Sequence, residues 1–422
     1  MAKSQPTPPD KEAVLSRSQI LSLYLPALIL SLGTGIIAPV LPVFAKSFDI
    51  SIGVASMVLV GYQVGALGAT LPAGYLMDKI GRRPILLAGP ILMAVSTILN
   101  AFAGSFWELV LYRAIGGAAN QLWMQARLAV IADTAGVNQR ARQITWMIGM
   151  QRGGTMLGPA LGGYLAVVDI RLPFLVHGVI TLLAIIPSFL LVKETAFIAQ
   201  AADPGATPGK SSSVRGDWAR LKPVLFTVQM IAFLFIQFFA TVCRGGEGGT
   251  FNLYAVYAYD IGPEALGILN FAAGVVVFPI PFVTGYFMDR FGRKFVVVPS
   301  FIIYGLALAL MGVTAYLNMP YVAYVVVFFV VQGCLSTTNG TMQVLGSDVA
   351  PAFARGMFFG IWRFIAQVGA LLGPALFGLV AEYIDYGTAF QVTAVAALAV
   401  ALLVGFILKE TVQREPARAA AG

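Results

Sequence analysis

The sequence contains little charge, one histidine and two cysteines. Only 11% of its 422 residues are Asp, Glu, Lys or Arg, whereas soluble domains contain about 25%. This composition excludes a soluble enzyme, a disordered chain and a nucleic-acid-binding module. His177, Cys243 and Cys334 are too few for a metal cluster or a disulfide framework, and the sequence shows no nucleophile–base pair and no phosphate-binding loop. We therefore expect no cofactor and no enzymatic activity.

Long apolar runs make up most of the chain. Hydrophobic residues account for 58% of the 422 residues, and the mean hydropathy is +0.83. Twelve membrane-crossing helices of about 20 residues each would need ~240 residues, which matches that share. Helices are expected rather than strands, because the runs are apolar on all sides and hydrocarbon requires backbone hydrogen bonds within the segment. The predicted spans are 20–45, 52–77, 85–104, 108–133, 143–167, 172–192, 222–258, 263–288, 295–316, 320–348, 355–381 and 386–408.

The spans fall into two groups of six, separated by a polar segment rich in Ala, Gly, Ser and Pro. We therefore predict an all-α membrane protein with 12 transmembrane helices in two six-helix bundles. The predicted parts are a disordered cytoplasmic leader (1–18), an N-terminal bundle (19–192), a cytoplasmic linker (193–221), a C-terminal bundle (222–409) and a cytoplasmic tail (410–422).

The basic residues predict the orientation of the chain. If both termini are cytoplasmic, 20 of the 27 Lys and Arg residues lie in cytoplasmic segments, and only Lys46 and Arg171 lie outside. Because cytoplasmic loops are enriched in Lys and Arg, we expect both termini inside. The expected location is the plasma membrane, the inner membrane of a bacterium.

The two halves of the chain are repeats of each other. The segment 74–87 recurs at 285–298, an offset of 211 residues, and LGPALGG at 157–163 recurs as LGPALFG at 372–378, an offset of 215. Internal repeats of this kind are typical of transporters. We infer a duplicated six-helix unit, so the two bundles are expected to be pseudo-symmetric.

A charged, glycine-containing motif follows the second span and recurs after the eighth. The pattern G-x-x-x-D-[RK]-x-G-R-[RK] is found at 74–83 and again at 285–294. In both copies it resembles the signature of the major facilitator superfamily, and the resemblance covers essentially all 12 spans. It implies the fold of that family, with two six-helix halves that rock against each other to give alternating access.

The same resemblance implies a conformational gate at this motif. The glycines permit close helix approach and a tight reversal, and the aspartate can accept hydrogen bonds from the N-terminal amides of a helix in the other half. In the family, the arginine pairs with an aspartate that ends the fourth span. A merely basic cytoplasmic loop would explain the arginines but not the aspartate. The predicted gate residues are Gly74, Asp78, Gly81, Arg82, Asp133, Gly285, Asp289, Gly292, Arg293 and Asp348.

Two further motifs resemble those of the 12-span drug:proton antiporters. The sequence LYRAIGGAA in the fourth span resembles an arginine motif that the family associates with proton coupling, and Arg113 is the matching residue. The fifth span contains G-x-x-x-G-P-x-x-G-G, whose small residues predict a groove for a neighbouring helix and whose proline permits a kink. An ordinary packing face is the alternative interpretation. The predicted helix-packing residues are Gly154, Gly158, Pro159, Gly162 and Gly163.

Charged residues inside the predicted spans point to a hydrated cavity. Each arginine at a helix centre costs about 2.5–3.5 kcal/mol, and at membrane depth only Glu247 opposes them. At least one or two arginines must therefore face water, backbone carbonyls or a ligand, which a central cavity would provide. The arginines within spans are Arg113, Arg127, Arg152, Arg244 and Arg363.

The seventh span has an unusual centre, Cys-Arg-Gly-Gly-Glu-Gly-Gly at 243–249. Each glycine lowers helix propensity by about 1 kcal/mol, so we expect a broken helix, as in other transporters. Glu247 is the leading candidate for reversible protonation, and a structural ion pair with Arg244 is the alternative. The predicted proton-coupling residues are Glu247, Arg113 and Arg244.

Polar and aromatic residues at membrane depth form a pool of candidates for the cavity lining. His177 is interpreted as a hydrogen-bonded structural residue, with a proton-relay role as the alternative. An individual aromatic residue in this pool can equally face lipid or pack between helices. The predicted substrate-cavity residues are Gln63, Asn120, Gln121, Trp123, Arg127, Arg152, Gln237, Tyr254, Asn270, Asn339, Trp362 and Arg363.

The sequence leaves three functional hypotheses. The first is a proton-coupled antiporter that exports amphiphilic or lipophilic organic molecules. The second is a carrier for organic anions or anionic lipids, because a cavity rich in guanidinium groups attracts carboxylate or phosphate. The third, a receptor on the same fold, has no extra domain to support it. The expected partners are a small organic substrate and membrane lipids, with no nucleic acid, and the protein is expected to be a monomer.

Overall fold

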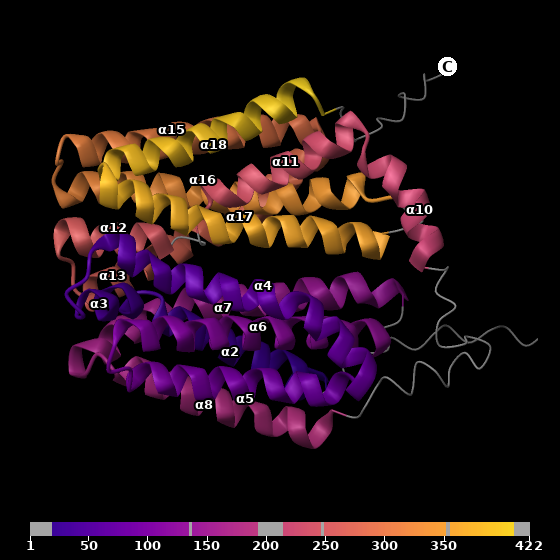
Figure 1. Ribbon diagram of the computed structural model, residues 1–422, viewed down its shortest axis with the longest axis horizontal. Helices are drawn as coiled ribbons and strands as arrows, with labels where there is room; N and C mark the ends of the chain where they lie inside the picture. Colours follow the sequence, from indigo (N-terminus) through magenta and orange to yellow (C-terminus); the bar gives the residue numbers. More distant parts are fainter. Residues whose placement is uncertain (1–18, 135–136, 193–213, 246–248, 352–354, 409–422) are drawn as a thin grey trace, which may run out of the picture.

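The chain folds into helices that form two groups side by side (Figure 1). The computed structural model describes residues 19–134, 137–192, 214–245, 249–351 and 355–408, and this part of the chain contains helices and no strand. The predicted all-α fold is confirmed. The elements are the π-helix η1 (Ile20–Tyr24) and the α-helices α2 (Leu25–Ile37), α3 (Val40–Lys46), α4 (Ile52–Ile80), α5 (Arg82–Ala101), α6 (Phe106–Thr134), α7 (Val137–Val168), α8 (Leu172–Leu191), α10 (Val214–Leu225), α11 (Val228–Cys243), α12 (Gly249–Tyr259), α13 (Pro263–Val277), α14 (Ile280–Phe291), α15 (Arg293–Tyr316), α16 (Tyr321–Val349), α17 (Arg355–Tyr383) and α18 (Tyr386–Phe406).

The helix lengths agree with twelve membrane crossings. Within the described residues, nine helical segments are long and apolar enough to cross a membrane. Helices α6 and α7 are also long enough, with 29 and 32 residues, but Arg113 and Arg152 are among the charged residues that lower their hydropathy. The pair α11 and α12 supplies the remaining crossing. Helix α10 covers the end of the segment predicted as the linker. The predicted leader, the predicted tail and residues 193–213 of the predicted linker lie outside the described residues.

Three of the crossings are interrupted. The first breaks between α2 and α3 at Pro39, and the eighth breaks between α13 and α14 at Pro279, because proline has no N–H to donate within a helix. In the seventh crossing α11 ends at Cys243, and Gly245 has a φ of 48°, a conformation that glycine adopts without steric cost. The broken helix predicted for this crossing is therefore observed.

The sequence repeat is also a structural repeat. Arg83, which begins the third crossing, donates a hydrogen bond of 2.9 Å from Nη2 to the carbonyl oxygen of Phe189 at the end of the sixth. Lys294 occupies the equivalent position in the second copy, and its Nζ donates a hydrogen bond of 2.9 Å to the carbonyl oxygen of Gly405 at the end of the twelfth. The same contact thus fastens the same two helices in each half.

The two halves meet at two equivalent helix crossings. Helix α7 crosses α13 where Gly163 faces Gly267, and an added Cβ at Gly163 would lie 3.2 Å from the Cα of Gly267. Helix α17 crosses α4 where Gly378 faces Ser56, whose side chain an added Cβ at Gly378 would overlap. Each crossing depends on small residues that let two helices approach closely, and the repeat offsets relate one crossing to the other.

One end of the molecule, which we call the Lys46 end, joins the halves through polar contacts. It comprises the end of α3, the start of α4 and the chain that follows α12, and α3, α12 and α13 lie together there in Figure 1. Lys46 Nζ lies 2.6 Å from Asp260 Oδ1 and 3.0 Å from the carbonyl oxygen of Val256, to both of which it donates. Tyr257 Oη donates a 3.0 Å hydrogen bond to the carbonyl oxygen of Ile50. The opposite end, which carries Arg82 and Arg293, is called the Arg82 end.

Close packing of α4 on α6 predicts a stability difference between two glycines of α4. An added Cβ at Gly65 would overlap the carbonyl oxygen of Ala114, which cannot rotate away, whereas an added Cβ at Gly68 meets no atom within 4 Å. We expect Gly65→Ala to lower the apparent melting temperature of the purified protein, with an overpacking cost of about 1–3 kcal/mol. Gly68→Ala is the matched control and should leave that temperature unchanged or raise it, since alanine favours helix. Equal melting temperatures for the two variants would contradict this packing.

The Lys46–Asp260 contact predicts how the Lys46 end opens. Replacing Lys46 by Gln, or Asp260 by Asn, removes the ion pair, and Asn tolerates the left-handed backbone at position 260, where φ is 53°. We expect either variant to increase the distance between spin labels on Phe102→Cys and Leu317→Cys, measured by double electron–electron resonance after the two native cysteines are replaced. Phe102 and Leu317 are equivalent positions of the two halves, and each is 64% exposed.

The same distance should depend on pH only in strongly acidic solution. The hydrogen bond and positive charge of Lys46 lower the pKa of Asp260 below its ordinary value, so the contact persists at neutral pH and is lost as the pH falls through that lowered pKa. The label distance should therefore stay constant between about pH 8 and pH 5. Arg171→Gln, at the same end of the molecule, is the control for loss of one charge. A distance that is insensitive to both Lys46→Gln and Asp260→Asn would show that this contact does not hold the halves together.

Candidate functional site

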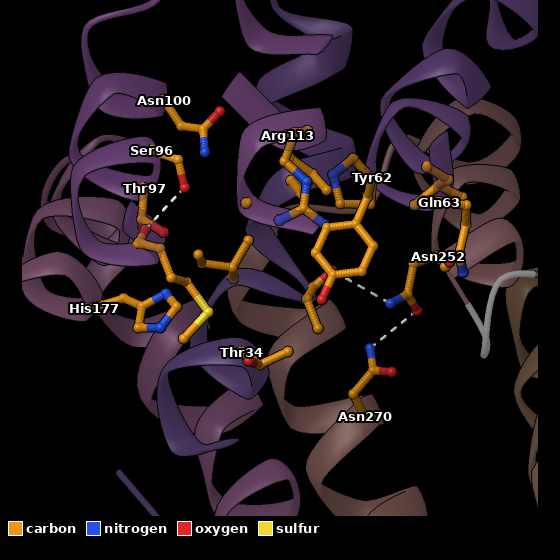
Figure 2. Close-up of a pocket in the computed structure, with 18 residues that line it drawn as sticks. Thr34, Tyr62, Gln63, Ser96, Thr97, Asn100, Arg113, His177, Asn252 and Asn270 are labelled. Carbon is orange, nitrogen blue, oxygen red and sulfur yellow. Dashed lines mark hydrogen bonds between the residues drawn. The ribbon is translucent and has the colours of Figure 1, made fainter. Parts of the chain in front are cut away.

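A cavity of about 260 Å³ lies among the helices of the N-terminal half, against α12 and α13 of the C-terminal half (Figure 2). Arg113 is the seventh residue after the start of α6, about 10 Å along the helix axis, so the cavity lies below the Lys46 end. Its lining residues are Thr34, Ile37, Ala38, Leu41, Pro42, Leu59, Tyr62, Gln63, Met93, Ser96, Thr97, Asn100, Arg113, Gly116, His177, Gly249, Asn252 and Asn270.

Arg113 supplies the positive charge of the lining. Its guanidinium carbon lies 4.7 Å from the centre of the Tyr62 ring, a cation–π contact of the kind worth about 0.5–2 kcal/mol. Its Nε is buried without a hydrogen-bond partner among the described residues. The contact with Tyr62 is worth less than the roughly 2.5–3.5 kcal/mol that an arginine costs at a helix centre, so part of that cost is left for water or a ligand to offset.

His177 and Asn100 face the cavity from α8 and α5 (Figure 2). His177 is 3% exposed, and its ring packs so closely on α2 that an added Cβ at Gly33 would overlap it. Neither ring nitrogen has a hydrogen-bond partner in the part of the chain that the structure describes, so the expected structural hydrogen bond is not found. Asn100 Oδ1 is likewise buried without a described partner. Buried polar atoms of this kind are normally satisfied, so this side of the cavity carries hydrogen-bonding groups that the described residues leave unpaired.

The opposite side of the cavity is formed by amides that connect the two halves. Asn252 of α12 donates a 3.4 Å hydrogen bond from Nδ2 to the carbonyl oxygen of Ala38, and Asn270 of α13 donates a 3.0 Å hydrogen bond from Nδ2 to Asn252 Oδ1. Movement of the halves would break the first of these bonds. The cavity is therefore coupled to the joint between the halves.

Apolar side chains complete the lining. Ile37, Leu41 and Pro42 come from α2 and α3, Leu59 comes from α4 and Met93 comes from α5. The volume is just below the ~300–1,000 Å³ of typical ligand pockets, which combine apolar walls with a few placed polar groups. The arrangement suits a small amphiphilic molecule with one polar end.

The structure brings three of the predicted site residues to this cavity, namely Gln63, Asn270 and Arg113. The guanidinium carbon of Arg127, which is 2% exposed, lies 4.3 Å from the centre of the Trp123 ring, and its Nη2 donates a 3.2 Å hydrogen bond to Gln151 Oε1. This cluster lies inside the N-terminal half and outside the described lining.

Other predicted cavity residues also lie away from this lining. Tyr254 is buried in a group of aromatic rings of the C-terminal half, edge-on to Tyr324 and Phe390. Trp362 packs near Gly346, whose added Cβ would lie 3.0 Å from the Trp362 ring. Among the remaining predicted residues, Gln237 is buried, Asn120, Gln121, Asn339 and Arg152 are half-buried, and Arg363 is exposed.

The predicted proton-coupling residues are distributed over two places. Arg113 lies in the cavity, and Glu247 lies outside the described residues. Arg244 is buried at the end of α11, where Nε donates a 2.7 Å hydrogen bond to the carbonyl oxygen of Ala240 and Nη1 donates to Asn339 Oδ1. Arg244 is thus held by two acceptors of its own half, one of them the predicted cavity residue Asn339.

The predicted gate lies at the Arg82 end. Gly81 and Gly292 have φ values of 96° and 103°, which only glycine adopts without strain, so each copy of the motif makes the tight reversal that was expected. Gly74 and Gly285 have open space around them, and Arg82 and Arg293 each begin a helix. The side chains of Asp78, Asp133, Asp289 and Asp348 lie outside the described residues.

The predicted packing residues of α7 lie against α2. Added Cβ atoms at Gly154, Gly158 and Gly162 would overlap the backbone of Leu28, Leu32 and Ile36 in turn. Gly163 faces the other way, toward α13 of the second half. One short motif therefore packs α7 inside its own half and also forms the joint between the halves.

Sequence reasoning did not identify several residues of the site. Tyr62, Asn100 and Asn252 are ordinary residues in apolar runs, and no pattern marks them. Asp49 and Asp260 are related by the repeat offset of 211 and share a positive φ of 54° and 53° in the structure, but no sequence pattern pairs Asp260 with Lys46.

Comparisons with known proteins agree with this architecture. The family model of the Major Facilitator Superfamily matches residues 23–243 and 233–422. The chain is 26% identical over 395 residues to the quinolone resistance protein NorA of Staphylococcus aureus (strain N315), covering 87% of this chain and 96% of that protein. It is 23% identical over 264 residues to multidrug resistance protein 2 of Bacillus subtilis (strain 168), covering 62% of this chain and 65% of that protein.

Solved structures show the same fold. A D-xylose-proton symporter superposes with a TM-score of 0.77 at 16% identity, covering 93% of this chain and 98% of that one. The xylose transporter XylE from E. coli, in an inward open conformation, superposes with a TM-score of 0.73 at 17% identity, covering 94% and 97%. Since the family model matches nearly the whole chain and the two pseudo-symmetric halves enclose a cavity, this chain belongs to the Major Facilitator Superfamily and is a multi-pass membrane transporter.

Proposed function

We propose that this protein is a proton-coupled antiporter that exports small amphiphilic or lipophilic organic molecules across a bacterial plasma membrane. The observation that carries the proposal is the cavity itself, which combines apolar walls with the half-buried Arg113 and lies next to the joint between the halves. The names of two relatives, a quinolone resistance protein and a multidrug resistance protein, support drug-like substrates.

Alternating access follows from how the halves are joined. The Lys46 end is closed by the Lys46–Asp260 pair and by small-residue crossings, whereas the basic loops of the Arg82 end are cytoplasmic by the positive-inside rule. The described conformation is thus closed toward the outside. Opening the Lys46 end would break the Asn252–Ala38 hydrogen bond and expose the cavity outward. Proton binding need only bias the populations of two such states to drive transport.

We assign proton coupling to Glu247, together with Arg113 and Arg244. Glu247 follows Arg244 by three residues in the sequence of the seventh crossing, between the end of α11 at Cys243 and the start of α12 at Gly249. Arg113 lies in the cavity, so substrate and charge share the same space. A proton taken up from outside at Glu247 would be exchanged for substrate bound from the cytoplasm.

The test uses purified protein in liposomes with an acidic interior and a pH-sensitive dye inside. A panel of aromatic amphiphiles of different charge is added outside, and we expect at least one compound to raise the internal pH while it accumulates in the lumen. Glu247→Gln should abolish the pH change, because the amide cannot release a proton. Asp169→Asn, which removes an exposed loop carboxylate, is the matched control and should behave like the parent.

One result would contradict proton-coupled export, and a second would contradict the role assigned to Glu247. Accumulation that continues at the same rate after the pH gradient is collapsed would show a carrier that is not coupled to protons. Unchanged coupling in Glu247→Gln would remove Glu247 from the mechanism while leaving antiport intact.

A further inference from the structure

We infer that Arg113, Asn100 and His177 form a carboxylate-binding subsite, so that the substrates of this transporter are small amphiphiles that carry a carboxylate, as anions or as zwitterions. The inference rests on the proposed export function and specifies its substrate class. It is carried by the charge of the lining, the unpartnered polar atoms on one side of it, and the volume.

Arg113 brings a positive charge into the cavity. A guanidinium keeps its proton in proteins, and Arg113 has the Tyr62 ring as its described contact. The described residues place no carboxylate within 4 Å of it, and the cavity lining contains no Asp or Glu. Among the described residues, therefore, the charge has no acidic partner. A carboxylate on a bound molecule offers the geometry that a guanidinium binds with two parallel hydrogen bonds.

The position of Arg113 fits this role. Its guanidinium lies between Tyr62 on one side and Ser96, Thr97 and Asn100 on the other, with His177 below them (Figure 2). An arginine that served only to hold two helices together would bond a backbone carbonyl or a side chain of another helix, as Arg244 does with Asn339 Oδ1 of α16. Arg113 instead has its Nε buried and unpaired in the described structure.

His177 and Asn100 supply further hydrogen bonds. A neutral imidazole has one donor and one acceptor, and an amide has both kinds of group. Both ring nitrogens of His177 and the Oδ1 of Asn100 are without described partners, and both side chains are nearly fully buried. The protonated ring nitrogen of His177 and the Nδ2 group of Asn100 can donate to carboxylate oxygens. The other ring nitrogen of His177 and the Oδ1 of Asn100 can accept from an ammonium or hydroxyl group of the same molecule.

The rest of the lining restricts the molecule that carries the carboxylate. Ile37, Leu41 and Leu59 form an apolar wall, which disfavours a fully hydrated inorganic anion. A volume of about 260 Å³ holds a molecule of one or two rings and excludes a two-chain lipid. The positive charge of Arg113 would repel a lipophilic cation, because the described lining contains no carboxylate that could offset this repulsion.

The test compares three ligands with the same ring system and different charge. The full-length protein in lipid nanodiscs is titrated calorimetrically with 1-naphthoate, 1-naphthamide and 1-naphthylmethylammonium, and empty nanodiscs correct for partition into lipid. We expect naphthoate to bind about 10-fold or more tightly than naphthamide, as for a charge-assisted hydrogen bond, and the ammonium to bind most weakly.

Substitutions of Arg113 test whether this residue causes the preference for the carboxylate. In Arg113→Gln the affinity for naphthoate should fall to that for naphthamide, while the affinity for naphthamide stays within about twofold, which also shows that the variant is folded. Arg113→Lys should keep part of the preference, because a point charge replaces the planar fork. Arg171→Gln removes an exposed arginine outside the cavity and should leave all three affinities unchanged.

Several results would overturn the inference. These are equal affinities for naphthoate and naphthamide, tightest binding of the ammonium, naphthoate binding weaker than about 1 mM, or a carboxylate preference that persists in Arg113→Gln. None of these depends on a pH gradient, so the carboxylate subsite can fail while proton-coupled export of other amphiphiles stands. Loss of proton coupling in the liposome experiment would likewise leave the binding result intact.

Discussion

A positive charge inside an apolar crossing, which the described residues do not neutralise, is the constraint on which this structure depends. Arg113 lies in an apolar crossing and contacts the face of Tyr62, which offsets only part of the cost of placing a guanidinium there. If the two six-helix bundles were packed throughout as densely as a protein core, no water or ligand could reach Arg113 to offset that cost. A cavity that both repeats line relieves it and at the same time provides a place for a substrate.

The cavity can exist beside a mobile joint because the joint is made of small residues and a few polar contacts. Gly163 against Gly267 and Gly378 against Ser56 let the helices cross closely without interlocking large side chains. The Lys46–Asp260 ion pair that helps to close the Lys46 end is exposed, so breaking it is inexpensive compared with separating an apolar interface. The repeat makes the two crossings equivalent, which lets the halves rock about them.

The sequence predicted the fold well and the site only in part, for identifiable reasons. The lengths of the apolar runs, the basic loops and the duplicated motif determine where whole helices begin, end and repeat. The twelve crossings and the broken seventh helix could therefore be predicted. The lining of a cavity depends on helix rotation, which an all-round apolar span does not encode: Gln63 and Asn270 face the cavity, whereas Tyr254 and Arg127 pack within their own halves. His177 was expected to have a hydrogen bond, and none is described, because its packing on Gly33 orients it toward the cavity.

The central claim is that one cavity, shared by both halves, opens to one side of the membrane at a time. The most direct measurement replaces Gln63 with Cys in a background without the native cysteines and follows its labelling by an impermeant maleimide added to either side of oriented vesicles. A short bis-maleimide first cross-links Lys46→Cys to Asp260→Cys and so holds the Lys46 end closed. In this cross-linked protein, Gln63→Cys should react only with maleimide added on the side of the Arg82 end. Labelling from the Lys46 side in the cross-linked protein, or from neither side in any state, would contradict the account.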